Sequence, residues 1–327
     1  MLKNTVSQLL AGALPPAGHR QTLGSGVTVT WGEEGVVTLE PACPPQGAVL
    51  LSVGVHGNET APIEALDRLL NQLAEDAWPL RVRLRCVFGN PDAMRAGVRY
   101  LDDDLNRCFG APLAQRSRET ARAEVIRAAT QSFFAETPAD LPRLHYDLHT
   151  AIRGSQIEKF AICPFRPDGS PPPLRELNRL AAAGIAAILH HAAPSSTFSY
   201  FSLSQCHAES FTLELGQARP FGQNQSVHLG ALEQVLQQIG QGLPPAPPFL
   251  VPPRFAIVQE VIKRSDAFRL YLDEAVENFT PLALGMLLAE DGPHQTVITH
   301  PNARIIFPNP KVKNGLRAGL VIAPLEG

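Results

Sequence analysis

The stretch Val49–Val55 (VLLSVGV) is a nearly continuous run of apolar residues. An apolar run without polar alternation is typical of a strand covered on both faces, which is the usual situation in a parallel sheet. The run leads directly into His56–Glu59 (HGNE), after which apolar residues recur at helical spacing through Ile63–Leu73. Val82–Phe88 is again strand-like. This strand–helix–strand order predicts a parallel crossover.

Short β-prone runs and amphipathic stretches alternate as far as residue 242. The further strands that this pattern predicts are Val27–Trp31, Val36–Glu40, Leu144–Thr150, Phe160–Pro164, Ala186–His190 and Phe211–Leu215. The further helices are Ala114–Glu136, Leu174–Gly184 and Val227–Ile239. We therefore predict an α/β fold with a mixed, largely parallel sheet flanked by helices.

The segment Leu243–Pro253 contains six prolines in eleven residues, which predicts a stiff, extended linker. Beyond it the apolar runs are short, β-prone and separated by Gly and Pro, and they have no helical periodicity. We expect a catalytic α/β domain over residues 1–242, a proline-rich linker over 243–253, and a small sandwich- or barrel-like β-domain over 254–327. If the substrate is small, the β-domain should cover the mouth of the cleft.

The chain has 327 residues and a formal net charge of -3, which argues against a nucleic-acid or anionic-membrane partner. The longest apolar segment, Leu180–Leu189, is too short to span a bilayer. The N-terminal segment lacks the long apolar core of a signal peptide, so we expect a cytoplasmic protein. The sequence does not decide whether the protein forms a homo-oligomer.

The five cysteines are odd in number and far apart, without a CxxC pair. This spacing argues against a disulfide scaffold and against a cysteine-type zinc site. Cys86 and Cys163 lie in strand-like runs and are expected to be buried small hydrophobic residues.

Two histidines and a glutamate follow predicted strands. His56 and Glu59 lie three residues apart after the first strand, and His149 ends Leu144–Thr150. Ligands in open α/β sheets bind beyond the carboxyl ends of the strands, and two histidines with one glutamate form the ligand set of catalytic zinc sites. The alternative is a surface turn in which Asn58 or Thr60 caps the following helix.

Two carboxylates extend this hypothesis. Asp147 lies on the same strand face as His149 and is a candidate acceptor for the second N–H of that histidine. Glu214 lies inside the apolar run FTLELG, where a buried carboxylate needs a partner or a role, and a general base is such a role. The alternative for Glu214 is an outward-facing edge position. His145 is expected to lie deeper on the face of His149 and not to be a ligand.

Arginines and aspartates crowd the segment Arg95–Arg107. One interpretation is a solvated loop whose charges compensate one another. The other is that Arg99 or Arg107 binds a substrate carboxylate with its guanidinium fork, with Asn106 as a neutral donor. Asp102–Asp104 would then hold the arginines in place or cap a helix.

The ordered motifs HGNE (56–59), GNP (89–91), RYLDDDLNR (99–107), DLHT (147–150) and ELG (214–216) resemble the zinc carboxypeptidase-like amidohydrolases, in their aspartoacylase and succinylglutamate desuccinylase branch. The longer motifs VHGNETAP, HYDLHTAIRGS, TLELGQARPFGQN and NFTPLALGMLLAEDG, together with FPNP, are most similar to the succinylglutamate-cleaving members. The resemblance spans most of the chain and includes the predicted β-domain.

The resemblance implies one Zn²⁺ per chain, bound by the two histidines and the glutamate named above. It also implies that Glu214 acts on the attacking water and that Arg99 polarises the scissile carbonyl. Asn106 and Arg107 would bind the amino-acid carboxylate, with Arg153 as a second anchor. Family members often carry an arginine ten residues before the catalytic glutamate, and here that position is Ser204.

The reaction implied is hydrolysis of N-succinyl-L-glutamate to succinate and L-glutamate, in arginine breakdown through succinylated intermediates. The alternatives are an aspartoacylase-like deacylase of another acidic N-acyl amino acid, a zinc carboxypeptidase, and a metal-free protein that binds a sugar or an acid through the arginines of residues 95–107. A serine hydrolase is disfavoured because the chain contains no GxSxG motif.

Overall fold

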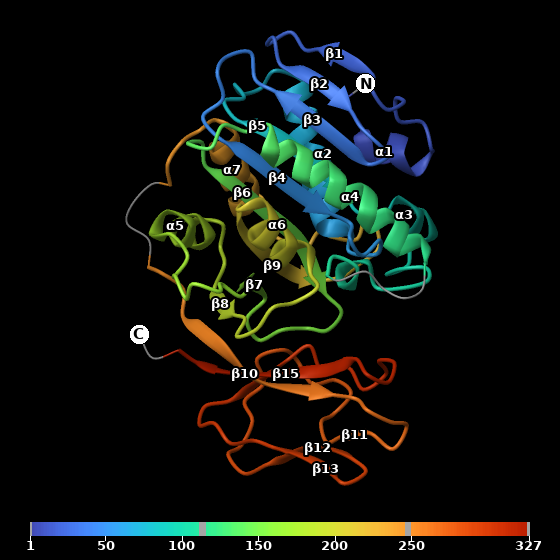
Figure 1. Ribbon diagram of the computed structural model, residues 1–327, viewed down its shortest axis with the longest axis vertical. Coiled ribbons are helices and arrows are strands. Elements are labelled where there is room, and N and C mark those ends of the chain that lie inside the picture. The colour runs from blue at the N-terminus through green and yellow to red at the C-terminus, as the bar shows by residue number, and fades with distance from the viewer. Residues whose placement is uncertain (1, 111–115, 246–249, 326–327) are drawn as a thin grey trace.

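A twelve-stranded sheet runs through most of the molecule, and helices cover both faces of its central part (Figure 1). The structure is a computed structural model that describes residues 2–110, 116–245 and 250–325. In spatial order the strands are β1 (Arg20–Thr22), β2 (Thr28–Trp31), β3 (Val36–Glu40), β5 (Arg83–Phe88), β4 (Ala48–Val53), β6 (Arg143–Ala151), β9 (Glu209–Gln217), β7 (Lys159–Cys163), β8 (Ala187–His190), β10 (Arg254–Ile262), β15 (Arg317–Pro324) and β14 (Arg304–Ile306).

The centre of the sheet is parallel. Strand β4 pairs in parallel with both β5 and β6, and β6 pairs in parallel with β9. Strand β7 is antiparallel to β9 but parallel to β8, and the outer strands β1 to β3 are antiparallel. All six residues of β4 are buried, which its apolar run predicted. The prediction of a mixed, largely parallel α/β sheet is therefore confirmed.

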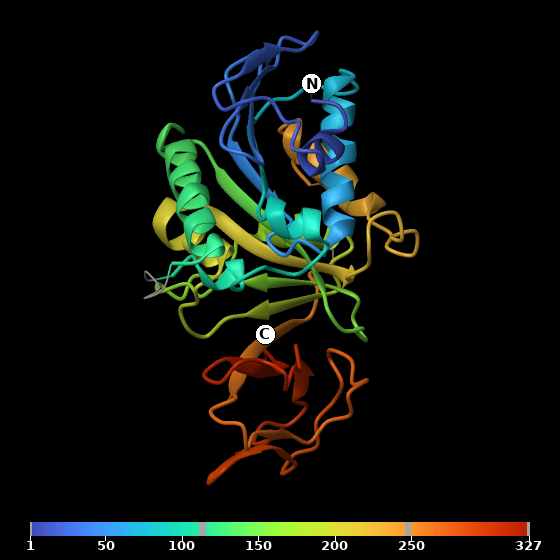
Figure 2. The ribbon, with the colours of Figure 1, turned by 90° about the vertical axis from the view of Figure 1, so that its right-hand side faces the viewer.

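Successive side chains of β4 point to opposite faces of the sheet and pack into two different apolar clusters. Val49 and Leu51 pack in one cluster, beneath α1, α2, α5 and α7, whereas Ala48 and Leu50 pack in the other, beneath α4 and α6 (Figure 2). The helices are α1 (Thr5–Leu10), α2 (Thr60–Ala74), α3 (Pro91–Ala96), η1 (Leu105–Arg107, a 3-10 turn), α4 (Arg118–Ala135), α5 (Leu174–Ala182), α6 (Phe198–Cys206) and α7 (Gly230–Gly240). None of the helices in the described residues is both long and apolar enough to cross a membrane.

The sequence pattern missed helix α6, because its sequence FSYFSLSQC has no helical alternation of apolar and polar residues. Thr197 caps it by accepting a hydrogen bond from the backbone N–H of Tyr200. Phe198 stacks on Phe109 with ring centroids 4.5 Å apart, so tertiary packing and a cap stabilise this helix. Helix α4 begins at Arg118, later than the predicted residue 114; residues 111–115 lie outside the described residues.

The C-terminal part joins the central sheet through β10, which pairs in parallel with β8 and antiparallel with β15. A second, three-stranded antiparallel sheet lies at the far end of the molecule in Figure 1. It consists of β11 (Arg269–Leu270), β12 (Leu287–Asp291) and β13 (His294–Val297). Residues 250–325 contain no helix, as the pattern predicted. Of the expected proline-rich linker, residues 246–249 lie outside the described residues, and the carbonyl of Pro253 accepts a hydrogen bond from the N–H of Ile188.

The five cysteines are free thiols, as their spacing predicted. Cys86 and Cys163 are fully buried in strands, and burial raises the pKa of Cys163 to about 12. They are packing residues of the core.

Candidate metal centre and active site

Two neighbouring parallel strands bring His56, Glu59 and His149 to one edge of the sheet. His56 follows β4 and Glu59 precedes helix α2, while His149 lies near the carboxyl end of β6. Glu59 occupies the N-cap position of α2 but makes no capping hydrogen bond there. Thr60 donates its hydroxyl to the carbonyl of Arg219 instead. The capping interpretation of the HGNE turn therefore has no support in the hydrogen bonds of these residues.

The side chains of His56, Glu59 and His149 converge in the interior. One potential ligand atom from each lies within 4.8 Å of the other two, and all three residues are buried. His56 Nδ1 is 2.8 Å from Glu59 Oε1, and His149 Nδ1 is 2.9 Å from Glu59 Oε2. The carboxylate of Glu59 thus lies between the two imidazoles.

The second nitrogen of each imidazole lies against an aspartate. His149 Nε2 is 3.0 Å from Asp147 Oδ2, the contact that the strand spacing predicted. His56 Nε2 is 2.9 Å from Asp104 Oδ1, a contact that the sequence analysis missed. The sequence predicts that Asp104 holds the arginines in place or caps a helix. Asp104 does cap η1, where it accepts a hydrogen bond from the N–H of Asn106. A proton on each Nε2, donated to its aspartate, leaves each Nδ1 lone pair free for a metal ion.

The charges of this cluster depend on one another. Burial raises the pKa of Glu59, but His56 and His149 outweigh burial, so that its pKa lies well below the usual range. Burial lowers the pKa of His149, but Asp147 and Glu59 outweigh it and raise the pKa well above the ordinary value. The cluster therefore favours an ionised Glu59, and a cation at the Nδ1 atoms would take the place of imidazole protons.

The donor set fits a zinc ion. Imidazole nitrogen and carboxylate oxygen are ligands that Zn²⁺ prefers, and catalytic sites use three protein ligands with a fourth position for water. The two aspartates that fix the imidazoles complete the arrangement found around metal-binding histidines. No other cluster of three His, Cys, Asp or Glu residues in the described part of the chain is arranged in this way.

Glu214 stands beside His149, because strands β6 and β9 pair with these two residues in register. Glu214 is buried, so the alternative of an outward-facing edge position is wrong. The pKa of Glu214 is raised to about 7, because burial and the charge of Glu59 outweigh the lowering effect of His149 and Arg99. Its Oε2 atom has no hydrogen-bond partner among the described residues. A buried, unpaired carboxylate that titrates near neutrality is suited to proton transfer.

Arg99 reaches the same cluster. Its Nη1 donates to Glu59 Oε1 at 2.7 Å, and its Nη2 is 3.8 Å from Asp104 Oδ2. The carbonyl of Arg99 accepts a hydrogen bond from the N–H of Gly57, which ties the segment Arg95–Arg107, the arginine loop, to the HGNE turn. The loop is therefore part of the site, and its charges do not simply compensate one another in solvent.

Asn106 and Arg107 lie in η1, directly after Asp104. The Oδ1 atom of Asn106 accepts from the N–H of Phe198, so its amide NH₂ group remains as a donor. Arg107 is half-buried and donates to the carbonyl of Asn106 at 3.2 Å.

Arg153 lies apart from this group, at the contact with the C-terminal part of the chain. Its guanidinium donates to the carbonyl of Glu274, and Asn278 donates its N–H to the carbonyl of Gly154 at 2.9 Å. In this arrangement Arg153 joins the segment after β6 to residues 274–278. The other N–H groups of its guanidinium have no hydrogen-bond partner in the described residues.

A buried polar network lies behind the cluster. Ser52 donates to Asp147 Oδ1 at 2.6 Å and lies 2.7 Å from His145 Nε2, whose Nδ1 is 2.6 Å from Ser202 Oγ. His145 is therefore a buried residue and not a ligand, as expected, but its link to Asp147 through Ser52 was not foreseen. Ser52 faces Asp147 in the register of β4 and β6, so pairing these strands correctly would have suggested the contact.

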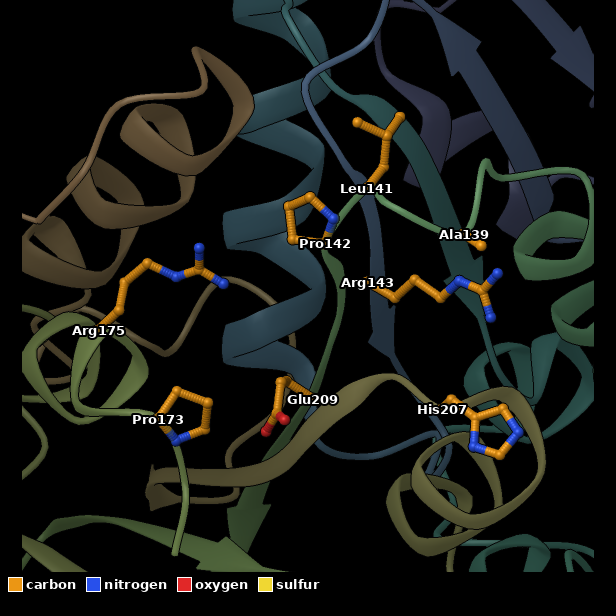
Figure 3. Close-up of a pocket in the computed structure, with 8 residues that line it drawn as sticks. All are labelled: Ala139, Leu141, Pro142, Arg143, Pro173, Arg175, His207 and Glu209. Atoms are coloured by element: carbon orange, nitrogen blue, oxygen red, sulfur yellow. The ribbon is translucent and has the colours of Figure 1, made fainter.

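A separate hollow of about 450 Å³ opens at the opposite end of the sheet (Figure 3). Its lining includes Arg143, at the start of β6, and Glu209, at the start of β9. His149 and Glu214 lie near the other ends of these strands. Because the hollow lies at the opposite ends of these strands, it is not part of the metal-binding cluster. Arg143 donates to the carbonyls of Cys206 and Thr137.

Comparison with protein families gives two matches that together cover most of the chain. Residues 45–239 match the succinylglutamate desuccinylase/aspartoacylase catalytic domain, and residues 252–325 match the AstE/AspA barrel-sandwich hybrid domain. The succinylglutamate desuccinylase of Pseudomonas fluorescens is 49% identical over 316 residues, which cover 94% of this chain and 93% of the relative. That of Burkholderia thailandensis is 45% identical over 327 residues, covering 98% and 93%.

Solved structures give the same result. The crystal structure of the succinylglutamate desuccinylase from Chromobacterium violaceum is similar with a TM-score of 0.87 and 39% identity, covering 98% of each chain. The structure of the enzyme from Vibrio cholerae has a TM-score of 0.91 at 30% identity and covers 98% of this chain and 94% of that one. The likeness extends through the C-terminal strands as well as the central sheet.

Proposed function

The chain belongs to the succinylglutamate desuccinylase/aspartoacylase family, and from this membership and the geometry of the site we propose that it is a zinc-dependent enzyme that hydrolyses N-succinyl-L-glutamate to succinate and L-glutamate. Family membership makes the chain a hydrolase of amide bonds. The substrate is proposed because relatives that are 45–49% identical over nearly the whole chain carry this name.

One observation carries the proposal of the site. Two histidines, each in contact with an aspartate, and one glutamate bring potential ligand atoms within 4.8 Å of one another. Beside them lies a second, buried glutamate, Glu214, whose Oε2 atom has no hydrogen-bond partner in the described residues. We propose that His56, Glu59 and His149 hold one Zn²⁺. Bound there, zinc would supply Lewis-acid chemistry, lowering the pKa of a water molecule to about 7 and polarising the amide carbonyl.

Glu214 is the proposed general base. In its ionised form it accepts a proton from the attacking water, and it then returns this proton to the amide nitrogen as the C–N bond breaks. Its raised pKa suits both steps, since the group changes charge near neutral pH. Its burial keeps bulk water away from the transferred proton.

The arginine loop is proposed to bind and orient the substrate. Arg99 keeps one arm on Glu59 and has other guanidinium N–H groups for the scissile carbonyl, whose oxygen gains negative charge during attack. Asn106 and Arg107 are proposed to hold a carboxylate of the amino-acid half, and Arg153 to act as a second anchor.

We also propose that residues 254–327 form a domain that follows a linker at 243–253 and covers the cleft. A contact between this part of the chain and the arginine loop supports the proposal, since Lys313 Nζ lies 3.9 Å from Asp103 Oδ1.

The test is release of the amino acid from a panel of substrates by protein of measured metal content. The panel contains N-succinyl-L-glutamate, N-acetyl-L-glutamate, N-acetyl-L-aspartate and a peptide with a C-terminal glutamate. We expect about one zinc per chain, highest kcat/KM on the succinyl substrate, and loss of both zinc and activity in His149→Ala. Preference for N-acetyl-L-aspartate would favour the aspartoacylase-like alternative, and preference for the peptide would favour a carboxypeptidase. Full activity after complete metal removal would contradict the role of zinc.

A further inference from the structure

Arg317 comes from the C-terminal part of the chain but lies near the arginine loop. It begins strand β15 and pairs with Ile262 of β10. The segment before it contacts the loop directly, since Lys313 forms its ion pair with Asp103. The side chain of Arg317 is 24% exposed, and its ion-pair partner is Glu260, at 3.7 Å. The guanidinium is therefore largely buried but only loosely paired.

Arg107 is the second guanidinium at this place. The two arginines interact electrostatically with each other, and both act on His191. The pKa of Arg317 is lowered to about 10, chiefly by burial and in part by Arg107. Burial likewise lowers the pKa of His191 to about 4, with Arg317 and Arg107 adding to the effect. At neutral pH, His191 is thus uncharged.

In the described residues no carboxylate forms an ion pair with Arg107, and only Glu260 forms one with Arg317. Asp104 acts on both Arg107 and Arg317, but its Oδ1 is already bound to His56 Nε2. Glu260 is half-exposed at 51%, which weakens its interaction with Arg317. Arg107 has no ion pair within 4.0 Å among residues 2–110, 116–245 and 250–325. Two like charges at a partly buried place repel one another, and the attraction of each to an anion bound between them would offset that repulsion.

We propose that Arg107 and Arg317 together bind one carboxylate of the glutamyl half of the substrate, so that the C-terminal part of the chain supplies a substrate-binding residue. The guanidinium fork suits this role, because it donates two parallel hydrogen bonds to a carboxylate. The proposal rests on the proposed function, in which Arg107 belongs to the amino-acid side of the cleft.

The experiment compares Arg317→Met with wild type on N-succinyl-L-glutamate and on its two monoamides, N-succinyl-L-glutamine and N-succinyl-L-isoglutamine. Methionine keeps the apolar stem but removes the charge. We expect KM for N-succinyl-L-glutamate to rise about 10- to 100-fold with kcat changed less than threefold, the cost of one charge-assisted hydrogen-bonded contact. For the monoamide that lacks the bound carboxylate, the substitution should change KM less than threefold.

Arg269→Met is the matched control, because Arg269 is an exposed arginine of the second sheet. It should leave all three KM values unchanged. Arg317→Lys keeps a charge without the fork and should give an intermediate KM, which also keeps the test valid if the methionine variant folds poorly. An unchanged KM in Arg317→Met and Arg317→Lys, or an equal loss on all three substrates, would overturn the proposal.

A binding measurement separates this proposal from the proposed function. L-Glutamate is titrated calorimetrically into wild type, Arg317→Met and Arg269→Met, each with its zinc content measured. Affinity should fall at least about tenfold only in Arg317→Met. If wild type does not hydrolyse N-succinyl-L-glutamate but this loss occurs, the function is wrong and the anion site stands. If wild type hydrolyses it and Arg317→Met binds L-glutamate normally, the function stands and the anion site is wrong.

Discussion

Glu214 and His149 occupy paired positions on the neighbouring parallel strands β9 and β6. This register places the proposed base beside a proposed zinc ligand, while Glu214 Oε2 remains without a partner in the described residues. The two side chains therefore have separable roles, one in proton transfer and the other in holding the metal.

Replacing Glu214 with glutamine should abolish turnover without loss of the metal. Glutamine has nearly the same shape but accepts no proton, so kcat should fall by about 10²–10⁴, the usual contribution of general acid–base catalysis. Zinc content, measured by mass spectrometry on the purified protein, should equal that of wild type. A glutamine variant that retains full kcat would remove Glu214 from the mechanism.

Ser52→Ala should weaken metal binding, although Ser52 is not itself a proposed ligand. Ser52 fixes Asp147, which in turn orients His149, and loss of such outer contacts typically lowers metal affinity about 10- to 100-fold. Competition with a zinc-binding dye measures this affinity without relying on activity. Ser202→Ala is the control, because Ser202 contacts His145 but not Asp147. Both variants should lose about 1–3 kcal/mol of unfolding free energy, but only Ser52→Ala should lose zinc affinity.

Gly57→Ala should displace the HGNE turn. A Cβ at this position would lie 2.2 Å from the backbone carbon of Ala93 in α3, a contact that requires the backbone to move. We expect a loss of about 1–3 kcal/mol in unfolding free energy together with weaker zinc binding, because His56 and Glu59 flank the glycine. Gly230→Ala is the control, since a Cβ there meets no atom within 4 Å. If Gly57→Ala unfolds and binds zinc as wild type does, this close approach does not matter.

His145 should make the fold sensitive to acid. Burial lowers its pKa to about 4, so the folded state keeps it neutral while the unfolded chain protonates it below the ordinary value of about 6.5. As pH falls from 6.5 to 4, the unfolded state binds more protons and this residue should cost up to about 3 kcal/mol of stability. Urea unfolding measures the effect.

The comparison variant is His145→Asn, which does not titrate. Its unfolding free energy relative to wild type should rise by up to about 3 kcal/mol between pH 7 and pH 4. A difference between wild type and His145→Asn that stays constant across this range would mean that His145 has the same pKa in the folded and unfolded states, which would contradict the prediction.

The sequence by itself determined the elements whose residues carry their own pattern. The apolar run of β4, the helical spacing of α2 and the strand containing His149 were all predicted, because alternation and periodicity follow from local backbone geometry. Parallel strands place their carboxyl ends at one edge, so the convergence of His56, Glu59 and His149 could also be expected. Asp147 followed from strand spacing alone.

Only the tertiary structure decided which distant side chains meet. Helix α6 is stabilised by a cap and by packing against Phe109, which no local periodicity reveals. Asp104 reaches His56 because the arginine loop folds back over the HGNE turn, where the N–H of Gly57 bonds to the carbonyl of Arg99. Lys313 reaches Asp103 in the arginine loop because β10 joins the central sheet at β8 and carries β15 with it. Such contacts depend on how whole elements pack, and local sequence patterns do not encode that packing.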